Sequence, residues 1–440
     1  MSGGENVRGP GGTVVIVGSS IAGVRAAQAL RTEGHQGRIV LVGAESELPY
    51  DKPPLSKQFL SGTRDQAGIG LLTSAEAATA GIALRLGAAA THLDPAAHRV
   101  RLADGTELGY DTCVLATGAA ARPAPWLTAG GVHVLRTLGD GHALRRDLAQ
   151  GGTGHVVVVG GGFIGAEVAA TARRLGHDVT VVDPLPLPMA RVLGPEVGAH
   201  LAALHRRHGV ATRFGTGVRS VTGGTGDLRV ELADGTVLAA RTVVVGIGAV
   251  PNDTWLASSG LRLDDGVLCD AYCRARGVPD VFAAGDVARW YHPGHGAHVR
   301  VEHWTNAVEQ AAQVAHNITH PEAMRPYAPV EYVWSDQYDF KIQIVGRPAG
   351  PAPDAPVPGD PVLIGRWEGE DARAAALYGD ADGRLRAAAT VNWPRALLDC
   401  RRLVAQGADL AAARTRIDRL AEASARPAPS PATSPSGAGS

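Results

Sequence analysis

Residues 155 to 183 read HVVVVGGGFIGAEVAATARRLGHDVTVVD, and this stretch decides the fold of the chain. It has the pattern of a buried strand, a glycine turn, an amphipathic helix and a second strand, which is typical of a dinucleotide-binding βαβ unit. Gly160, Gly162 and Gly165 stand at the GxGxxG positions. They permit a tight turn, close approach of the backbone to a pyrophosphate, and close packing of the helix. The stretch therefore predicts a dinucleotide held at a helix N-terminus.

The strand that ends this unit carries an acid at its last position. Asp183 stands where a carboxylate can bind both hydroxyls of a ribose. A 2′-phosphate would be repelled there, and the next four residues, Pro184 to Leu187, offer no arginine to bind it. The sequence therefore favours NADH over NADPH, with Arg191 as the residue best placed to reverse that preference.

A second copy of the unit lies at residues 13 to 45, which read TVVIVGSSIAGVRAAQALRTEGHQGRIVLVGAE. Gly18, Ser20 and Gly23 occupy the three glycine positions, so the middle one departs from the pattern, although serine is the smallest polar substitute. We expect Glu45 to be the ribose acid of this unit, while the residue before it also stands at the end of the strand. Two units predict two dinucleotides, and hydride transfer from nicotinamide to flavin is the commonest chemistry between such ligands.

Composition limits the class of protein. The 440 residues are 45% hydrophobic, enough to fill the cores of about three domains. With 42 Lys+Arg against 43 Asp+Glu, no overall field would draw the protein onto nucleic acid or an anionic membrane. No stretch approaches the roughly 18 apolar residues of a membrane span, and the N-terminus lacks the apolar core of a signal peptide. We therefore expect a cytoplasmic enzyme with no nucleic-acid or membrane partner.

The four cysteines are scattered along the chain without CxxC spacing. They are Cys113, Cys269, Cys273 and Cys400. This distribution argues against a disulfide framework and against an iron–sulfur cluster of the protein's own. We expect these side chains to be packing residues, and we expect no metal site.

Apolar strands followed by glycine turns recur outside the two units, in VLATG at 114 to 118, VVVGIGAVPN at 243 to 252 and DVFAAGDVA at 280 to 288. Their order suggests an α/β fold with two Rossmann-like dinucleotide-binding domains, the NAD domain inserted in the FAD domain. From Tyr327, short alternating strands and two helical patterns predict a small C-terminal α+β domain. The expected segments are a disordered N-terminus at 1–12, an FAD-binding domain at 13–120 and 247–326, an NAD-binding domain at 121–246, the C-terminal domain at 327–425 and a disordered tail at 426–440.

The stretch LPYDKPPLSKQFL at residues 48 to 60 is hard to explain by structure alone. Pro53 and Pro54 impose an extended path, and Lys57 follows at what we expect to be a helix start. A lysine near a flavin ring would stabilise negative charge on the reduced ring. From this stretch alone, an ordinary solvated lysine is the competing interpretation.

Six motifs follow one another along the chain: LPYDKPPLSK, GGGFIGAE, VVVGIGAVPN, VFAAGDVA, VEHWTNAVEQA and VWSDQYD. On these motifs the chain resembles the ferredoxin reductases that serve oxygenase systems, a group related to putidaredoxin reductase and rubredoxin reductase. The resemblance covers about residues 13 to 420. It implies a flavoprotein that passes electrons from NADH through FAD to a ferredoxin, which in turn supplies a monooxygenase or a Rieske dioxygenase.

The resemblance also implies roles for particular residues. Lys57 and Glu167 would form an ion pair beside the flavin, as the catalytic pair. Arg122 would contact the FAD pyrophosphate, Asp286 would bind the ribitol chain, and Trp304 would lie near the flavin ring. The full set of expected cofactor-binding residues is Gly18, Ser20, Ala22, Gly23, Glu45, Lys57, Thr117, Gly118, Arg122, Gly160, Gly162, Ile164, Gly165, Asp183, Gly246, Gly248, Gly285, Asp286 and Trp304.

In the expected reaction, NADH delivers a hydride to flavin N5, and two single-electron transfers to a ferredoxin follow. Ferredoxins are commonly acidic, so we expect a local basic face on this protein. Its candidate residues are Arg289, Arg300, Arg325 and Lys341. The sequence leaves open whether the protein is a monomer or a homodimer.

Two other functions compete with this one. A flavoprotein disulfide reductase or NADH oxidase typically needs a reactive cysteine near the flavin, and residues 1 to 112 contain none. A nucleotide-bound binding protein, related to the apoptosis-inducing flavoproteins, would use clustered Lys and Arg to bind nucleic acid. The near-neutral charge and the lack of a long basic run argue against that use.

Overall fold

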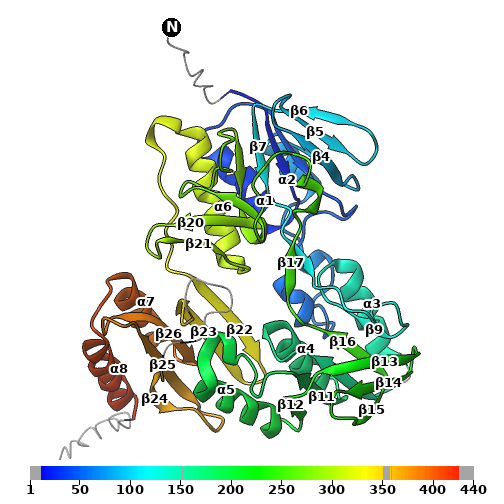
Figure 1. The fold of residues 1–440 in the computed structure, drawn as a ribbon, viewed down its shortest axis with the longest axis vertical. Coiled ribbons are helices and arrows are strands. Elements are labelled where there is room, and N and C mark those ends of the chain that lie inside the picture. The colour runs from blue at the N-terminus through cyan, green and yellow to red at the C-terminus, as the bar shows by residue number, and fades with distance from the viewer. Residues whose placement is uncertain (1–10, 151, 350–356, 358, 426–440) are drawn as a thin grey trace, which may run out of the picture.

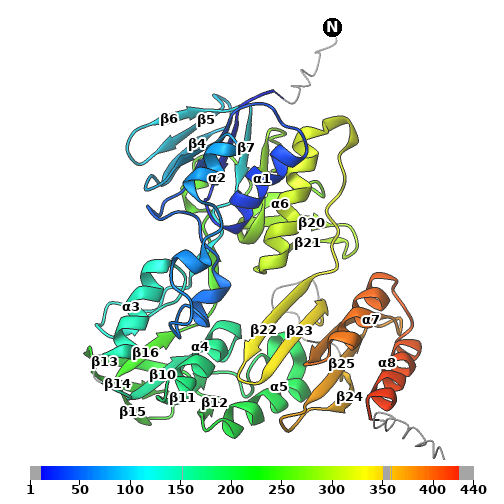
Figure 2. The same ribbon diagram turned by 180° about the vertical axis from the view of Figure 1, so that it is seen from behind.

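The computed structural model describes residues 11–150, 152–349, 357 and 359–425 (Figure 1). Both ends that we expected to be disordered lie outside the described residues, apart from Gly11 and Gly12. Three five-stranded sheets organise the described chain, and each is the centre of one domain. The first domain lies at one end of the molecule, and the second and the C-terminal domains lie side by side at the other (Figures 1 and 2).

The first domain is a parallel sheet covered by helices. Its strands follow the order β19 (Val281–Ala283), β7 (Thr112–Leu115), β1 (Val14–Val17), β2 (Ile39–Val42) and β3 (Ile82–Arg85). Every residue of β1 and β2 is buried, as expected for parallel strands covered on both faces. Helices α1 (Ile21–Thr32) and α6 (Trp304–Thr319) pack against each other beside this sheet (Figure 1).

The segments before β8 (Ala119–Ala121) and after β17 (Ala249–Pro251) also form smaller strands and helices, outside the large sheet. The strands are β4 (Ala90–Asp94), β5 (Arg99–Leu102), β6 (Glu107–Gly109), β18 (Val267–Cys269), β20 (Ala288–His292) and β21 (Ala297–Arg300). The helical elements are α2 (Ser74–Thr79) and the 3₁₀ helices η1 (Pro53–Ser56), η2 (Ala67–Ile69), η3 (Thr254–Leu256), η4 (Gly285–Val287) and η5 (Pro321–Ala323).

The second domain repeats the plan of the first. Its sheet has the order β12 (Ala211–Phe214), β11 (Asp178–Asp183), β10 (His155–Val159), β16 (Thr242–Val245) and β9 (Val132–His133). Helices α3 (Leu138–Ala149), α4 (Phe163–Arg174) and α5 (Ala190–Arg207) and a small antiparallel sheet of β13 (Val218–Gly224), β14 (Asp227–Leu232) and β15 (Val237–Ala240) complete it. In each of the two parallel sheets the strand that opens the βαβ unit, β1 or β10, lies between its successor and a later strand. Its carboxyl end is therefore a topological switch point, where ligands of such sheets bind.

The chain crosses between these two domains twice, and the crossings pair with each other. β8 (Ala119–Ala121) runs toward the second domain and forms an antiparallel pair with β17 (Ala249–Pro251), which runs back. The chain then adds β19 to the edge of the first sheet. The second domain is therefore an insertion in the first.

The C-terminal domain is an antiparallel sheet with two helices on one side. Its strands follow the order β22 (Tyr332–Gln337), β23 (Phe340–Gly346), β26 (Leu385–Val391), β25 (Arg373–Gly379) and β24 (Val362–Arg366), and α7 (Pro394–Ala405) and α8 (Leu410–Ala425) follow them. The other face packs on α5, where the Tyr378 hydroxyl donates a hydrogen bond to the Leu193 carbonyl at 2.9 Å. The predicted fold class, two Rossmann-like domains and a small α+β domain, is confirmed. Within the described ranges, no helix has both the length and the apolar character that a membrane crossing needs.

Candidate active site

The two glycine turns have the same backbone geometry. Gly18 has φ +121° and Gly160 has φ +109°, backbone angles that residues other than glycine rarely adopt. A Cβ on Gly18 would lie 2.0 Å from the carbonyl oxygen of Ala116, and one on Gly160 would lie 2.2 Å from that of Gly246. Each turn therefore presses on the end of the neighbouring strand, which only glycine allows.

The third position of each turn must also be glycine, because it lies against the first glycine of the same turn. A Cβ on Gly23 would lie 1.7 Å from the carbonyl oxygen of Gly18, and one on Gly165 would lie 1.9 Å from that of Gly160. The first turn of each helix thus lies directly on the glycine turn below it. This contact brings the helix N-terminus to the carboxyl end of the first strand.

The middle position explains why serine replaces glycine in the first unit. Ser20 and Gly162 are the N-caps of α1 and α4, with φ values of −98° and −78°. A Cβ on Gly162 would meet nothing within 4 Å. The protein itself therefore accepts a small side chain at this position, and Ser20 does not alter the turn.

The helices that begin at these turns, like α5, α6 and α7, lack the side-chain caps that α2 and α3 have. α2 and α3 begin with complete capping boxes, built on Thr73 and Thr137. The Ser20 side chain makes no capping hydrogen bond at α1, and no acidic residue stands in the first turn of α1 or α4. Uncapped N–H groups at a helix N-terminus favour an anion such as a pyrophosphate.

Two cavities meet at these turns. One of about 430 Å³ is lined by parts of all three domains, and one of about 410 Å³ extends along the first turn toward Glu45. Five residues line both, so the two cavities adjoin: Ser20, Lys52, Ala116, Gly118 and Arg136. An elongated ligand fits this shape better than a compact one.

Most of the residues expected to bind cofactors line these cavities. The larger cavity is lined by Ser20, Ala22, Lys57, Gly118, Gly162, Ile164, Glu167, Gly246, Gly248, Gly285, Asp286 and Trp304. The smaller one is lined by Gly18, Ser20, Glu45, Thr117 and Gly118. The residues that line neither cavity are Gly23, Arg122, Gly160, Gly165 and Asp183.

Lys57 and Glu167 form an ion pair at the wall of the larger cavity. Lys57 Nζ lies 2.7 Å from Glu167 Oε2, and the two side chains are only 13% and 5% exposed. The lysine is the C-cap of the single 3₁₀ turn η1, which contains Pro53 and Pro54, so the extended path expected for the two prolines was wrong and no α-helix starts at Lys57. The segment that follows β2 packs against the second domain: its Phe59 lies in one apolar cluster with Leu138, the first residue of α3. This packing holds the lysine beside α4, which carries Glu167.

Serines from two other parts of the chain complete the environment of Glu167. The Ser56 hydroxyl donates to Oε2, and the Ser335 hydroxyl of β22 donates to Oε1 at 2.9 Å. The carboxylate, which α4 of the second domain carries, therefore receives donors from the first and C-terminal parts of the molecule. Neither serine was predicted, because no sequence pattern relates them to residue 167.

Asp286 has a partner that the sequence analysis missed. Arg136 Nη2 lies 2.9 Å from Asp286 Oδ2, and Arg136 lines both cavities. Arg122 itself lines neither cavity, and it donates to the carbonyl oxygen of Ala249 at 3.3 Å. Arg136 follows β9 closely at the carboxyl edge of the second sheet, and that position was the available signal. The role expected for Arg122 stays a prediction.

The two acids of the βαβ units lie in unlike surroundings. Asp183 Oδ2 accepts a hydrogen bond from the Gly161 N–H at 2.6 Å, so the carboxylate is held against its own turn. Glu45 accepts a hydrogen bond from the Tyr50 hydroxyl at 2.6 Å and lies 3.5 Å from Lys52 Nζ. Burial raises the pKa of Tyr50 and lowers the pKa of Lys52.

Trp304 begins α6 at the wall of the larger cavity. Its indole N–H donates to Asp51 Oδ1 at 2.8 Å, and burial raises the pKa of Asp51 in spite of this bond. The ring also meets Trp334 of β22 edge to face, with centroids 5.8 Å apart. Beside it, burial lowers the pKa of His303 to about 4, so this imidazole is neutral near pH 7. His303 Nδ1 is buried and has no hydrogen-bond partner among the described residues, which leaves it free for a ligand.

The cysteines take no part in these cavities. All four lie within the described residues and are free and buried. Burial raises the pKa of every one of them, and that of Cys273 reaches about 12. None is placed or ionised as a reactive thiol needs to be.

Most residues of the expected basic face form ion pairs with neighbouring aspartates. Arg289 lies 3.0 Å from Asp264, and Arg300 lies 2.9 Å from Asp265. Lys341 Nζ is likewise 3.0 Å from an Asp336 oxygen. Three of the four candidate cations therefore belong to ion pairs. Their partner carboxylates offset much of the positive charge that would attract an acidic partner.

Comparison with known proteins assigns the family. The pyridine nucleotide-disulphide oxidoreductase model matches residues 12–311, and the reductase C-terminal model matches residues 332–421. The chain is 40% identical over 398 residues to the ferredoxin–NAD(+) reductase component of the anthranilate 1,2-dioxygenase system of Burkholderia cepacia, covering 90% of this chain and 94% of that protein. It is also 40% identical over 343 residues to rhodocoxin reductase of Rhodococcus erythropolis, covering 77% and 79%.

A solved structure agrees with these relatives. The covalent putidaredoxin reductase–putidaredoxin complex matches with a TM-score of 0.82 and 33% identity, over 94% of this chain and 99% of that one. The resemblance predicted from the six motifs is thus confirmed. The chain belongs to the pyridine nucleotide-disulphide oxidoreductase family, and its last domain is of the reductase C-terminal type.

Proposed function

We propose that the protein is an FAD-dependent NADH:ferredoxin reductase that supplies electrons to a monooxygenase or a Rieske dioxygenase. The observation that carries the proposal is the convergence of two glycine turns, each with an uncapped helix, on one cavity that holds the Lys57–Glu167 pair. Two dinucleotide sites that share a cavity suit transfer of a hydride between two cofactors. The ferredoxin reductases among the relatives support the same reaction class.

The residues of the first domain suit FAD. Gly18, Ser20 and Glu45 would hold its adenosine half along the smaller cavity. Asp286, together with Arg136 from the second domain, would hold the middle of the cofactor, and the larger cavity would hold the ring system. When bound, the flavin accepts two electrons together and releases them singly, which matches a nicotinamide donor to an iron–sulfur acceptor.

The second turn suits NADH. Gly162 and Ile164 face the larger cavity, and the uncapped N-terminus of α4 offers N–H groups to a pyrophosphate. Asp183 stands at the carboxyl end of β11, where its charge would bind ribose hydroxyls and repel a 2′-phosphate. NADPH is therefore the poorer donor.

Lys57 and Glu167 would act as a positioned charge pair. The ammonium group is nearly buried at the cavity wall, so it can stabilise negative charge that develops beside it in a water-poor site. Glu167 keeps the lysine in place, and the serine donors keep Glu167 in place. Because Ser335 belongs to the C-terminal domain, that domain also sets the geometry of the pair.

A ferredoxin is the acceptor that best suits the rest of the chain. The four cysteines are separate and buried, so they do not supply a cluster to receive the electrons. The free thiols also fit the reducing cytoplasm, where we place the protein. Disulfide reduction is disfavoured because no cysteine lines the cavity beside Lys57.

An anaerobic titration with NADH tests the proposal. The full-length protein, purified with its flavin, should bleach in the visible near one equivalent of NADH, and about two equivalents of an oxidised ferredoxin, each accepting one electron, should restore the oxidised spectrum. NADPH is the matched control, and it should bleach the flavin more slowly. Bound flavin that stays oxidised in excess NADH would overturn the reductase and favour a binding protein of the apoptosis-inducing type.

A further inference from the structure

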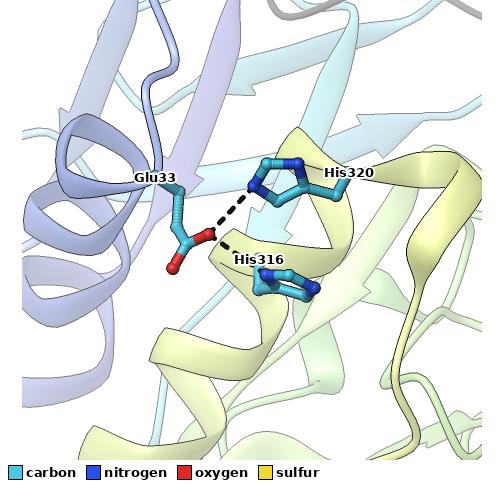
Figure 3. A group of neighbouring side chains, drawn as sticks. All are labelled: Glu33, His316 and His320. Atoms are coloured by element: carbon cyan, nitrogen blue, oxygen red, sulfur yellow. Dashed lines mark hydrogen bonds and ion pairs between the residues drawn. The ribbon is translucent and has the colours of Figure 1, made fainter.

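Glu33, His316 and His320 gather on the first domain outside the cavities (Figure 3). Glu33 is the C-cap of α1, and the two histidines lie four residues apart at the end of α6. His316 Nδ1 and His320 Nε2 each lie 3.0 Å from the same oxygen, Glu33 Oε2. Figure 3 shows both rings turned toward this carboxylate from neighbouring turns of one helix.

The geometry points to a binding site for a divalent transition metal, and we propose that it binds Zn²⁺. The three ligand atoms lie within 4.8 Å of one another. Tetrahedral zinc with bonds of about 2.0–2.1 Å holds neighbouring ligand atoms about 3.3 Å apart, so the two contacts of 3.0 Å to Glu33 Oε2 need little adjustment. Histidines at i and i+4 on a helix are a known way to place two imidazoles on one metal.

The second nitrogen of His316 supports the assignment. His316 Nε2 lies 3.3 Å from the carbonyl oxygen of Ala323, so a hydrogen on Nε2 leaves the Nδ1 lone pair directed at the metal position. Metal-binding histidines usually have such an outer hydrogen bond, which fixes the ring and its tautomer.

The donor set selects the class of metal. Two imidazole nitrogens and one carboxylate oxygen suit zinc, cobalt, nickel or copper and do not suit calcium or magnesium, which prefer oxygen alone. His320 and Glu33 are 43% and 34% exposed, so a metal can enter from solvent and keep a water as its fourth ligand.

A second cluster, His292, His295 and Glu331, has suitable residues but no free ligand set. His292 Nδ1 accepts the backbone N–H of His295 at 3.2 Å, and its Nε2 lies 3.0 Å from the carbonyl oxygen of Pro329. Both nitrogens of this buried ring are already engaged. The cluster therefore serves as a control within the same protein.

The position of the proposed site suggests what a bound metal would do. α1 and α6 pack against each other, and both begin at the wall of the larger cavity with Ile21 and Trp304. The metal would join their opposite ends, about 18 Å along the 12 residues of α1 and about 24 Å along the 16 residues of α6. It would thus stabilise the helix pair without touching the cofactors.

Metal binding by the full-length flavoprotein tests the proposal. After treatment with EDTA and dialysis, the protein should bind one Zn²⁺ in isothermal titration, and Co²⁺ should give the visible absorption of a low-coordinate site. Saturating Zn²⁺ should raise the melting temperature by several degrees, because it binds only the folded state. Glu33→Gln and His320→Asn should each weaken binding by about 10-fold or more and abolish this shift.

The matched control is His295→Ala, which should leave Zn²⁺ binding unchanged. The proposed Zn²⁺ site is overturned if the wild-type protein binds no Zn²⁺ at about 100 µM. The three side chains would then be an ion-paired cluster only. Equal binding by wild type, Glu33→Gln and His320→Asn would overturn it as well, and so would loss of binding in His295→Ala. The flavin spectrum and the melting curve of each variant verify that it is folded.

Discussion

The two glycine turns of this protein share a backbone but differ in what surrounds them. At Gly18 and Gly160 the neighbouring strand end comes so close that no side chain fits. The middle positions, Ser20 and Gly162, have ordinary φ values and open space. The GxGxxG pattern therefore combines two requirements. The outer glycines are needed because of close contacts within the protein, whereas the middle position has room for a side chain, so a need for glycine there would come from a bound ligand.

The turns also differ in how their acids are held. Asp183 is bound to the N–H of its own turn, whereas Glu45 is engaged by Tyr50 and Lys52. The Leu185 N–H also donates to Asp183 Oδ1 at 2.8 Å, so both oxygens of Asp183 are engaged as well, and the two acids differ in having backbone or side-chain partners. A carboxylate that is already engaged must exchange a partner, or keep it and bind the ribose with its other oxygen.

The largest effect should come from adding a methyl group to the first glycine of each turn. Gly18→Ala and Gly160→Ala each force a Cβ within 2.0 or 2.2 Å of a backbone oxygen, at a cost of about 2–5 kcal/mol. Gly18→Ala should lose the flavin on purification, while Gly160→Ala should keep it and lose reduction by NADH. Flavin content by absorbance and stopped-flow reduction measure the two. If both variants lost flavin to the same extent, the assignment of one turn to each cofactor would fail.

The next effect concerns the pair that spans the two units. Lys57→Met and Glu167→Gln should each slow flavin reduction by about 100-fold, because each removes half of a nearly buried charge pair. The double variant should be no slower than the worse single one, since the two side chains act together. Lys341→Met, at an exposed lysine, is the control for loss of a positive charge. Additive losses in the double variant would contradict a joint action.

Nucleotide preference should change less, and at one acid only. Asp183→Asn should raise kcat/KM for NADPH relative to NADH by about 10-fold, because the repelling charge at the ribose is gone. Glu45→Gln should leave that ratio within about 2-fold, since it belongs to the other turn. Steady-state kinetics with both nucleotides decides the point. An unchanged ratio in Asp183→Asn would mean that another residue holds the ribose.

The smallest effect should come from exchanging the middle residues. Gly162→Ser and Ser20→Gly should each change stability by about 0.5 kcal/mol or less, as serine and glycine differ little at an N-cap. The KM for NADH in Gly162→Ser should rise by about 3-fold at most. Thermal melts and kinetics measure both quantities. A loss of NADH binding in Gly162→Ser would show that the second ligand lies closer to its turn than the first.

Much of the fold was predictable because its signals are local. Continuous apolar strands such as Val156 to Val159, followed by a glycine turn and a helical pattern, report buried parallel strands without knowledge of any contact. The insertion of one domain in the other followed from the order of glycine turns, and Lys57 and Glu167 followed from resemblance. The extended path expected for Pro53 and Pro54 was wrong, because proline fixes φ at about −65°, a value that a 3₁₀ turn accepts as readily as an extended chain does.

The sequence by itself determined the strands, the turns and the identity of the residues that a dinucleotide needs, because these depend on periodicity and on backbone freedom at a few glycines. Only the tertiary structure decided the partners. Arg136 meets Asp286 across 150 residues, Ser335 meets Glu167 across 168, and His316 meets Glu33 across 283. Contacts between distant segments leave no periodic signal, and they exist only once the sheets and helices have packed into one arrangement.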